Sequence, residues 1–279
     1  MKSLFQEFSA NTREQWQQMA AKELGALGLD FLRKDTFEGI WANALSDSES
    51  HSLHPVSNGL GWTGVQELPD VADLNHWLNN RIQENWTAFR ISNHKHWLFL
   101  NENPEIRSPF TWFSELPFDS DWIKPLTGSA TNAIYQIKGV ESSDTLDLFP
   151  LGNAGATAVQ QLALLAWKLE SSQPVLIRVS VANHLLLEIA KLRLIRSWIP
   201  ANTKIYVQNV TWNKTATDAH NNLIRLTLEA ISAVLGGCDY LELSPYDLFL
   251  ETKDENALRY SRNIQYLLKH ESYLDKVSD

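Results

Sequence analysis

The residues of this sequence that could do chemistry are a few histidines, one cysteine and a run of spaced glycines. Asp218 and His220 have the spacing at which an aspartate orients a metal-ligating histidine. They also precede an apolar helical pattern, so helix capping by Asp218 is the interpretation we favour. His94 and His96 form a pair without a third ligand at zinc-binding spacing. We therefore expect solvent-facing histidines and no metal site.

Two further patterns have equally structural interpretations. Gly59, Gly61 and Gly64 match the spacing of a dinucleotide-binding fingerprint. They precede a strand-like run instead of joining a strand to a helix, which argues against a nucleotide site. Cys238 follows two glycines at the start of a strand, where a small buried residue is more expected than a reactive thiol.

Composition excludes several classes of protein. Hydrophobic residues make up 44% of the 279 residues and charged residues 20%, which is typical of a folded domain. The net charge of −9 and the absence of a basic run argue against a nucleic-acid partner. No stretch has the length of a signal peptide core or a membrane span, and a single cysteine suits a reducing compartment. The expectation is a cytoplasmic protein with no membrane partner, whose 11 tryptophans serve mainly in packing.

Strand-like runs alternate with helical patterns from Trp62 onward, as they do in βαβ units and parallel sheets. The predicted helices are 155–170, 184–198, 218–235 and 255–270. Between Asn101 and Asn132 four prolines interrupt any long element, so a degenerate unit is expected there. The predicted strands number eight, as in a (β/α)8 barrel: 62–68, 87–92, 96–100, 133–137, 146–149, 175–181, 204–210 and 240–243.

The amino-terminal region differs from this rhythm. Residues 1–45 predict an amphipathic helical arm, in which Thr12 caps a helix that carries Trp16, Met19 and Leu24 and ends at Gly25. Residues 46–61 are polar and contain proline and glycine, as linkers do. The predicted organisation is an arm at 1–45, a linker at 46–61 and an α/β barrel domain at 62–279.

Three stretches of the second half are more specific together than singly. Asn153 to Ala163 opens a helix with small residues directly after a strand, and Leu187 to Arg193 is a helix with a solvated charged face, where Glu188 and Lys191 can pair. His220 to Gly237 is an apolar helix that Gly236 ends. With Arg262-Asn263 and Glu271 to Val277, these blocks resemble, in the same order, the barrel domain of the methylmalonyl-CoA mutase family, most strongly over residues 148–279. A weaker likeness to its subunit-clasping arm covers residues 1–40.

The resemblance implies a barrel that threads an acyl-CoA, with adenosylcobalamin in a separate domain, for interconversion of methylmalonyl-CoA and succinyl-CoA. By this resemblance, Pro150 occupies the position at which catalytic members of the family carry a histidine. A proline side chain cannot transfer a proton. Asp218-Ala-His220 opens like a cobalamin motif but continues to Leu223 where that motif has glycine, and no cobalamin domain is expected in this chain. The sequence is thus similar to the non-catalytic small subunit of heterodimeric mutases.

The expected function under this resemblance is to stabilise a catalytic large subunit, which carries the adenosylcobalamin, with a homodimer as the isolated form. We expect Trp16, Met19 and Leu24 to contact the large subunit. The barrel is expected to be filled or closed. Remnants of a barrel mouth are expected at Asn153, Gly155, Gln208, Asn222 and Arg225. Two alternatives stay open: a catalytically competent or CoA-binding isomerase barrel acting with a separate cobalamin-binding chain, and a stand-alone acyl-CoA-binding or chaperone-like module.

Overall fold

The computed structural model describes residues 12–35, 39–44, 61–69, 71, 73–83, 88–92, 95–96, 111–114, 134–136, 145–252, 254 and 256–277. Its contacts divide the chain into two compact units, Met1–His51 and Ser52–Asp279. In the described residues no helix has the length and apolar character needed to cross a membrane.

The first unit contains one substantial helix, α1 (Arg13–Leu24). The Thr12 hydroxyl accepts a hydrogen bond from the Gln15 backbone at 3.3 Å, and the Gln15 side chain accepts one from the Thr12 backbone at 2.8 Å, which forms a capping box. The helix ends as predicted at Gly25, whose φ of 54° lies in the region that glycine tolerates best. Two 3₁₀ turns follow, η1 (Gly25–Leu27) and η2 (Leu29–Leu32). The short strands β1 (Lys34–Asp35) and β2 (Trp41–Ala42) then pair antiparallel.

The second unit is built on a parallel sheet of eight strands in the order β6-β5-β4-β3-β10-β9-β8-β7. The first strand pairs with the last, β3 with β10, and each other strand pairs with its neighbour along the chain, except for β6 with β7 within the described residues. This is the strand order of a (β/α)8 barrel. The strands are β3 (Thr63–Glu67), β4 (Ala88–Ile91), β5 (Thr111–Ser114), β6 (Ile134–Gln136), β7 (Thr145–Asp147), β8 (Leu176–Val181), β9 (Lys204–Asn209) and β10 (Tyr240–Glu242).

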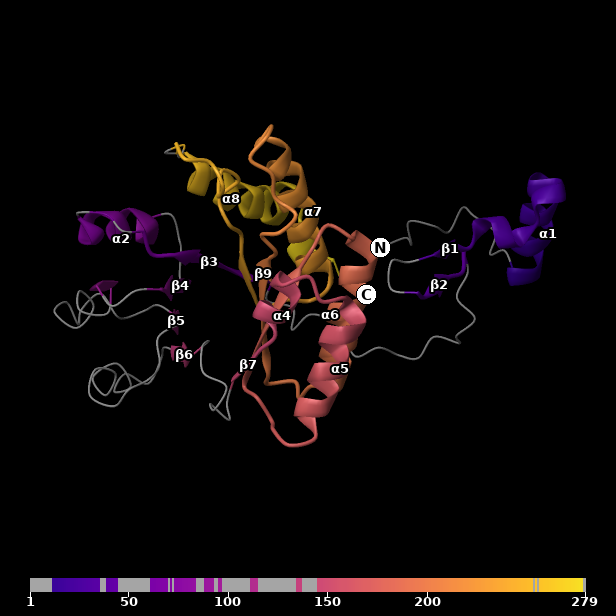
Figure 1. The fold of residues 1–279 in the computed structure, drawn as a ribbon, viewed down its shortest axis with the longest axis horizontal. Helices are drawn as coiled ribbons and strands as arrows, with labels where there is room; N and C mark the ends of the chain where they lie inside the picture. The colour runs from indigo at the N-terminus through magenta and orange to yellow at the C-terminus, as the bar shows by residue number, and fades with distance from the viewer. Residues whose placement is uncertain are drawn as a thin grey trace, which may run out of the picture. The chain divides into compact units, whose positions relative to one another are not determined.

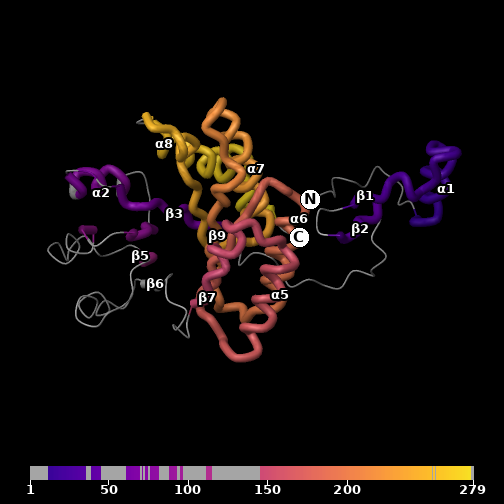
Figure 2. The backbone as a smooth tube through the Cα atoms, viewed as in Figure 1, coloured from indigo at the N-terminus to yellow at the C-terminus, as the bar shows by residue number. Residues whose placement is uncertain are grey.

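Helices alternate with these strands. Helix α2 (Leu74–Gln83) follows β3, and α4 (Phe149–Asn153) and α5 (Ala158–Leu169) follow β7. Helices α6 (Leu185–Trp198), α7 (Asn221–Leu235) and α8 (Ala257–Tyr266) follow β8, β9 and β10 in turn. A π turn, η4 (Leu267–Glu271), and a 3₁₀ turn, η5 (Leu274–Lys276), extend the last helix. Figure 1 shows α5, α6 and α7 gathered on one side of β7 and β9. Figure 2 follows the same alternation of strand and helix along the backbone.

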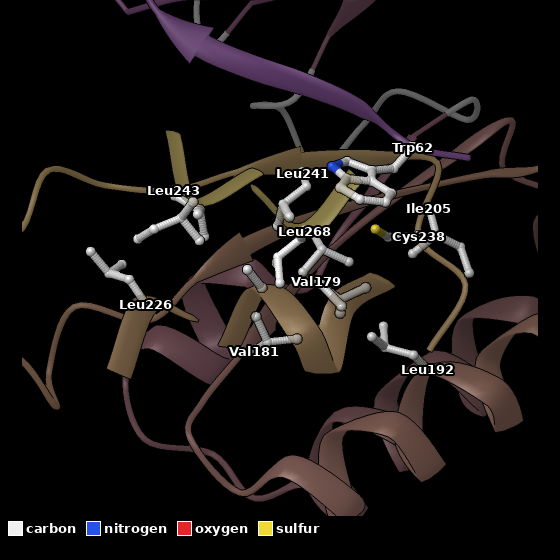
Figure 3. Close-up of a cluster of buried hydrophobic side chains, with 14 of the residues drawn as sticks. Trp62, Val179, Val181, Leu192, Ile205, Leu226, Cys238, Leu241, Leu243 and Leu268 are labelled. Carbon is white, nitrogen blue, oxygen red and sulfur yellow. The ribbon is translucent and has the colours of Figure 1, made fainter. Parts of the chain in front are cut away.

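Two apolar clusters occupy the two faces of the sheet, because successive strand residues point to opposite sides. The larger cluster joins outward-facing residues such as Val179, Val181 and Ile205 to Leu192 of α6 and Leu226 of α7 (Figure 3). Gly236 lies at the end of α7, beside this cluster. A side chain is excluded at this position, because a Cβ would lie 2.6 Å from the Leu192 side chain. The smaller cluster lies on the inner face and consists of Val65, Ala88, Phe113, Leu176 and Tyr206.

The predicted third strand, 96–100, is wrong where the structure describes it. Lys95 and His96 are helical, and the next strand, β5, is Thr111–Ser114, inside the region predicted to be degenerate. Four residues between prolines suffice for a barrel strand whose neighbours supply its hydrogen bonds. His96 is also buried rather than solvent-facing, and its Nε2 lies 3.1 Å from the Pro69 carbonyl oxygen. His94 lies outside the described residues.

Candidate functional site

A layer of charged side chains lies on the inner face of the sheet, next to the smaller apolar cluster. Strand alternation places these residues, because in β4, β8 and β10 a single charged residue stands between apolar neighbours. We define the interior network as Glu67, Arg90, Asp147, Arg178, Tyr206, Gln208 and Glu242.

Arg90 and Glu242 form the centre of the interior network. The Arg90 Nε lies 3.1 and 2.9 Å from the two carboxylate oxygens of Glu242, and the Arg90 Nη2 lies 2.8 Å from Oε1. The same Nη2 donates to Glu67 Oε2 at 2.6 Å. Arg90 and Glu242 are buried, so a forked pair of this kind is held with little competition from water.

The network continues across β9 and β8 to β7. The Tyr206 hydroxyl donates to Glu242, and the Gln208 amide donates to the same carboxylate at 3.3 Å. Arg178 donates to Gln208 Oε1 and lies 3.4 Å from Asp147 Oδ2. Its guanidinium carbon also sits 4.3 Å from the centre of the Phe149 ring, a cation–π contact.

The pKa shifts agree with a network of charges that stabilise one another. Burial by itself raises the pKa of Glu242, but the charge and hydrogen bonds of Arg90 outweigh it and hold this pKa below its usual value. Burial likewise lowers the pKa of Arg90, and the Glu242 carboxylate reverses the shift, so the guanidinium stays charged. Burial and the neighbouring Glu242 together raise the pKa of the Tyr206 hydroxyl, which stays protonated as a donor.

The interior network consists of ion pairs, hydrogen bonds and ring contacts. Two arginines are matched by three carboxylates, and Tyr206 also stacks on Phe113 with ring centres 4.6 Å apart. A general base must be able to reach a substrate proton. The Glu242 and Glu67 carboxylates instead accept hydrogen bonds from Arg90. The interior network therefore forms a largely buried polar layer on the inner face of the sheet.

The predicted mouth residues have different contacts in the structure. Gln208 belongs to the interior network. Asn153, at the end of α4, accepts hydrogen bonds from the Thr211 backbone at 2.7 Å and from its hydroxyl at 3.0 Å. Gly155 has a φ of 96°, and a Cβ at this position would meet no heavy atom of the described residues within 4 Å, so its backbone conformation explains the glycine.

Asn222 and Arg225 are neighbours on the first turns of α7. Asn222 donates to the carbonyl oxygens of Thr215 and Tyr246, both at 2.8 Å, and its own oxygen accepts from Thr215 and from Arg225 at 3.1 and 3.0 Å. The amide thus ties the loop before α7 to the loop after β10. Asn153 and Asn222 both hold loops at the carboxyl ends of the strands, where barrel enzymes carry their reacting groups.

A buried ion pair lies beside these loops. Lys214 Nζ is 2.9 and 2.8 Å from the two carboxylate oxygens of Glu229, and both side chains are 0% exposed. Burial raises the pKa of Glu229 to about 7, although Lys214 and Asn213 act to lower it. Burial also lowers the pKa of Lys214.

A second buried pair corrects the predicted solvated face of α6. Lys191 lies 2.6 Å from Glu188, as the three-residue spacing predicts, but the side chains are only 1% and 8% exposed. Lys191 also donates to the Ser180 carbonyl oxygen at 2.7 Å and to Gln161 at 3.4 Å. Lys191 therefore faces α5 and β8 instead of solvent, and Glu188 is buried beside it.

The remaining candidates keep structural roles. Pro150 is exposed in the first turn of α4, where its missing N–H costs nothing. Cys238 is buried, and burial raises its thiol pKa well above the usual range. Gly61 and Gly64 lie before and in β3, whereas Gly59 is outside the described residues. In the described part of the chain no three His, Cys, Asp or Glu side chains are grouped as metal ligands.

The capping role predicted for Asp218 is wrong. His220, not Asp218, precedes the first residue of α7, and the Asp218 carboxylate accepts from the side chain of Asn221 at 2.6 Å. Asp218 has a φ of 52°, a left-handed conformation that aspartate tolerates, and this displaces its side chain from the capping position. His220 is exposed and stacks on Tyr246, with ring centres 5.1 Å apart.

The charged members of the interior network were not predicted from the sequence. A signal was present: Arg90 in Ala-Phe-Arg-Ile, Arg178 in Leu-Ile-Arg-Val and Glu242 in Tyr-Leu-Glu-Leu each interrupt an apolar strand. A charge in such a run needs a buried partner, and only the strand order shows which partner is near.

Comparison with known proteins finds relatives for the second half of the chain. The methylmalonyl-CoA mutase family model matches residues 175–279, which contain β8, β9, β10 and α6 to α8. The chain is 31% identical over 189 residues to a protein named methylmalonyl-CoA mutase small subunit from Porphyromonas gingivalis, covering 57% of this chain and 30% of that protein.

Two further relatives have lower coverage. The mitochondrial methylmalonyl-CoA mutase of Bos taurus is 33% identical over 113 residues, 36% of this chain and 15% of that protein. The methylmalonyl-CoA mutase of Escherichia coli is 34% identical over 76 residues, 27% of this chain and 11% of that protein. The chain thus spans less than a third of the length of these relatives. The predicted resemblance to the methylmalonyl-CoA mutase family is confirmed, and residues 175–279 are the part of the chain that matches the family model.

Proposed function

We propose that this chain is the small, non-catalytic subunit of an adenosylcobalamin-dependent methylmalonyl-CoA mutase and that it stabilises a catalytic large subunit in the cytoplasm. The arm at residues 1–45, the linker at 46–61 and the barrel at 62–279 form its parts in this proposal. Trp16, Met19 and Leu24 contribute to the contact with the large subunit.

The observation that carries the proposal is the interior network. An acyl-CoA threaded through a barrel needs an open axis, whereas Arg90 and Glu242 meet across the inner face with side chains 8% and 4% exposed. Opening that space would separate a buried ion pair and leave charges without partners, which is costly. Pro150, which stands where the family's proton donor is expected, supports the same conclusion.

The residues of the cobalamin-like motif do not fit the cofactor. A ligating histidine needs an aspartate that orients its ring, but Asp218 is engaged with Asn221 and His220 packs on Tyr246. We therefore assign adenosylcobalamin to the partner subunit. Titration with hydroxocobalamin should leave the visible absorption spectrum of the cofactor unchanged, and a shift that His220→Ala removes would contradict this assignment.

Co-expression with a large mutase subunit tests the main proposal. The two chains should elute together, and the large subunit should melt at a higher temperature in the complex than alone. The chain alone, supplied with methylmalonyl-CoA and adenosylcobalamin, should give no succinyl-CoA. Turnover by the chain alone, or with a separate cobalamin-binding chain that has no barrel of its own, would instead establish the competent isomerase alternative.

A further inference from the structure

The loop between β9 and α7, residues 210–220, is attached by several hydrogen bonds and one ion pair to two other elements, α4 and α7. Asn153 of α4 accepts two hydrogen bonds from Thr211, and the Trp212 indole donates to the Gly152 carbonyl oxygen at 3.3 Å. Asn222 of α7 binds the backbone of Thr215. These are neutral hydrogen bonds, which are weaker than hydrogen bonds between charged groups.

The fourth attachment is different because it is charged and buried. Lys214 comes from the loop and Glu229 from the middle of α7, and neither side chain is exposed. Lys214 also donates to the Val210 carbonyl oxygen at 3.0 Å and to the Asn213 side chain at 2.6 Å. Asn213 in turn donates to Glu229 at 2.7 Å. The ammonium group thus has every hydrogen directed to an acceptor, and it joins the start of the loop to the helix.

The two ends of this pair belong to elements that could otherwise separate. The loop carries exposed residues on both sides of Lys214, including Trp212 at 52% exposure, and it contains no regular element of its own. The strand before it, β9, is held by ladders with β8 and β10. Breaking the pair would therefore leave the loop with only its neutral hydrogen bonds to Asn153, Gly152 and Asn222, while the sheet stays paired.

We propose that Lys214 and Glu229 form a latch that holds the β9–α7 loop closed, and that this loop opens as one unit, independently of the sheet, when the latch is broken. The latch turns a loop at the carboxyl end of a barrel strand, a position that enzymes use for mobile catalytic segments, into a fixed part of the fold. The inference does not depend on the proposed subunit role, because it concerns contacts within this chain alone.

Amide hydrogen exchange in the full chain tests the latch. The reporters are the backbone N–H groups of Thr211, Lys214 or its replacement, Thr215 and Thr217, each of which donates to a loop or neighbouring acceptor. At about pH 8 most of Glu229 is ionised, given its pKa of about 7. In Lys214→Met these amides should exchange at least about tenfold faster, while those of β8 and β9 keep the wild-type rate.

Lys191→Met is the matched control. It also removes a buried lysine that pairs with a glutamate, but Lys191 lies on α6 and contacts Glu188, Gln161 and Ser180, which are all outside the loop. Its loop amides should exchange as in the wild type. Equal acceleration in both variants would show that exchange follows general stability and would overturn the proposal.

The double variant K214M/E229M separates the latch from the cost of an unpaired charge. Two apolar side chains of similar size remove the orphaned carboxylate, so the melting temperature should recover toward the wild-type value, and this variant serves if Lys214→Met does not fold. The loop amides should nevertheless stay fast, because the bonds to Val210 and Asn213 are gone. Wild-type protection of the loop in the double variant, or acceleration spread evenly over β8, β9 and α7, would contradict a latch.

Discussion

Arg90 is the single residue on which the interior network depends most, since it contacts both Glu67 and Glu242. Arg90→Met would leave the buried Glu242 carboxylate without its cation, and we expect the free energy of unfolding to fall by ~3–5 kcal/mol in urea titrations. Lys204→Met is the control, because Lys204 is 33% exposed and its partner Asp239 keeps Arg196. That variant should lose only ~0–1 kcal/mol. Similar losses in the two variants would show that burial of the network is unimportant.

Glu229 should leave a signature in the pH dependence of stability. Burial raises its pKa to about 7 from an ordinary value of 4.5, so between these values the folded state holds a proton that the unfolded state has released. Stability therefore falls as pH rises through this window. Glu229→Gln has no such proton, and the stability of the wild type relative to it should drop by roughly 1–3 kcal/mol between about pH 5 and pH 7.5. A constant difference would mean that Lys214 keeps this carboxyl at its ordinary pKa.

Among the elements, α4 packs closely against β8 at Gly152. A Cβ on Gly152 would lie 1.8 Å from the Ser180 hydroxyl and 2.8 Å from the Gln161 amide nitrogen, so this helix can lie on β8 only if residue 152 lacks a side chain. Gly152→Ala should destabilise the protein by roughly 1–3 kcal/mol in thermal or urea unfolding. Adding Ser180→Ala removes the nearest atom and should recover part of the loss. If G152A/S180A is less stable than Gly152→Ala, the clash is not the cause.

At the scale of the whole molecule, the amino-terminal arm belongs to a separate compact unit, so we expect its removal to leave the second unit folded. None of the described residues of the first unit is buried, and Trp16 and Met19 are 36% and 62% exposed. Deleting residues 1–40 should leave the urea transition of the barrel in place and weaken binding to a large subunit, measured by sedimentation of the mixture. Trp16→Ser with Met19→Ser should weaken binding in the same direction. Unfolding of the truncated chain would show that the arm belongs to the barrel core.

Much of the second unit was predictable because its signals are local. The predicted helices at 184–198 and 218–235 correspond to α6 (Leu185–Trp198) and α7 (Asn221–Leu235), since apolar periodicity and terminal glycine depend only on nearby residues. The cap at Thr12 is local in the same sense. The strand β5 was missed because four residues among prolines are too few for a periodic signal.

The candidate site depended on tertiary structure. Arg90 and Glu242 are 152 positions apart, and they meet because β3 closes on β10 and brings β4 near the last strand. Likewise, Glu188 and Lys191 show a pairing distance in the sequence but not their burial, which comes from the packing of α6 on α5 and β8. The sequence by itself determined the alternation of strand and helix and the family resemblance. Only the pairing of β3 with β10 decided which buried charges face one another, because these strands are far apart in the chain.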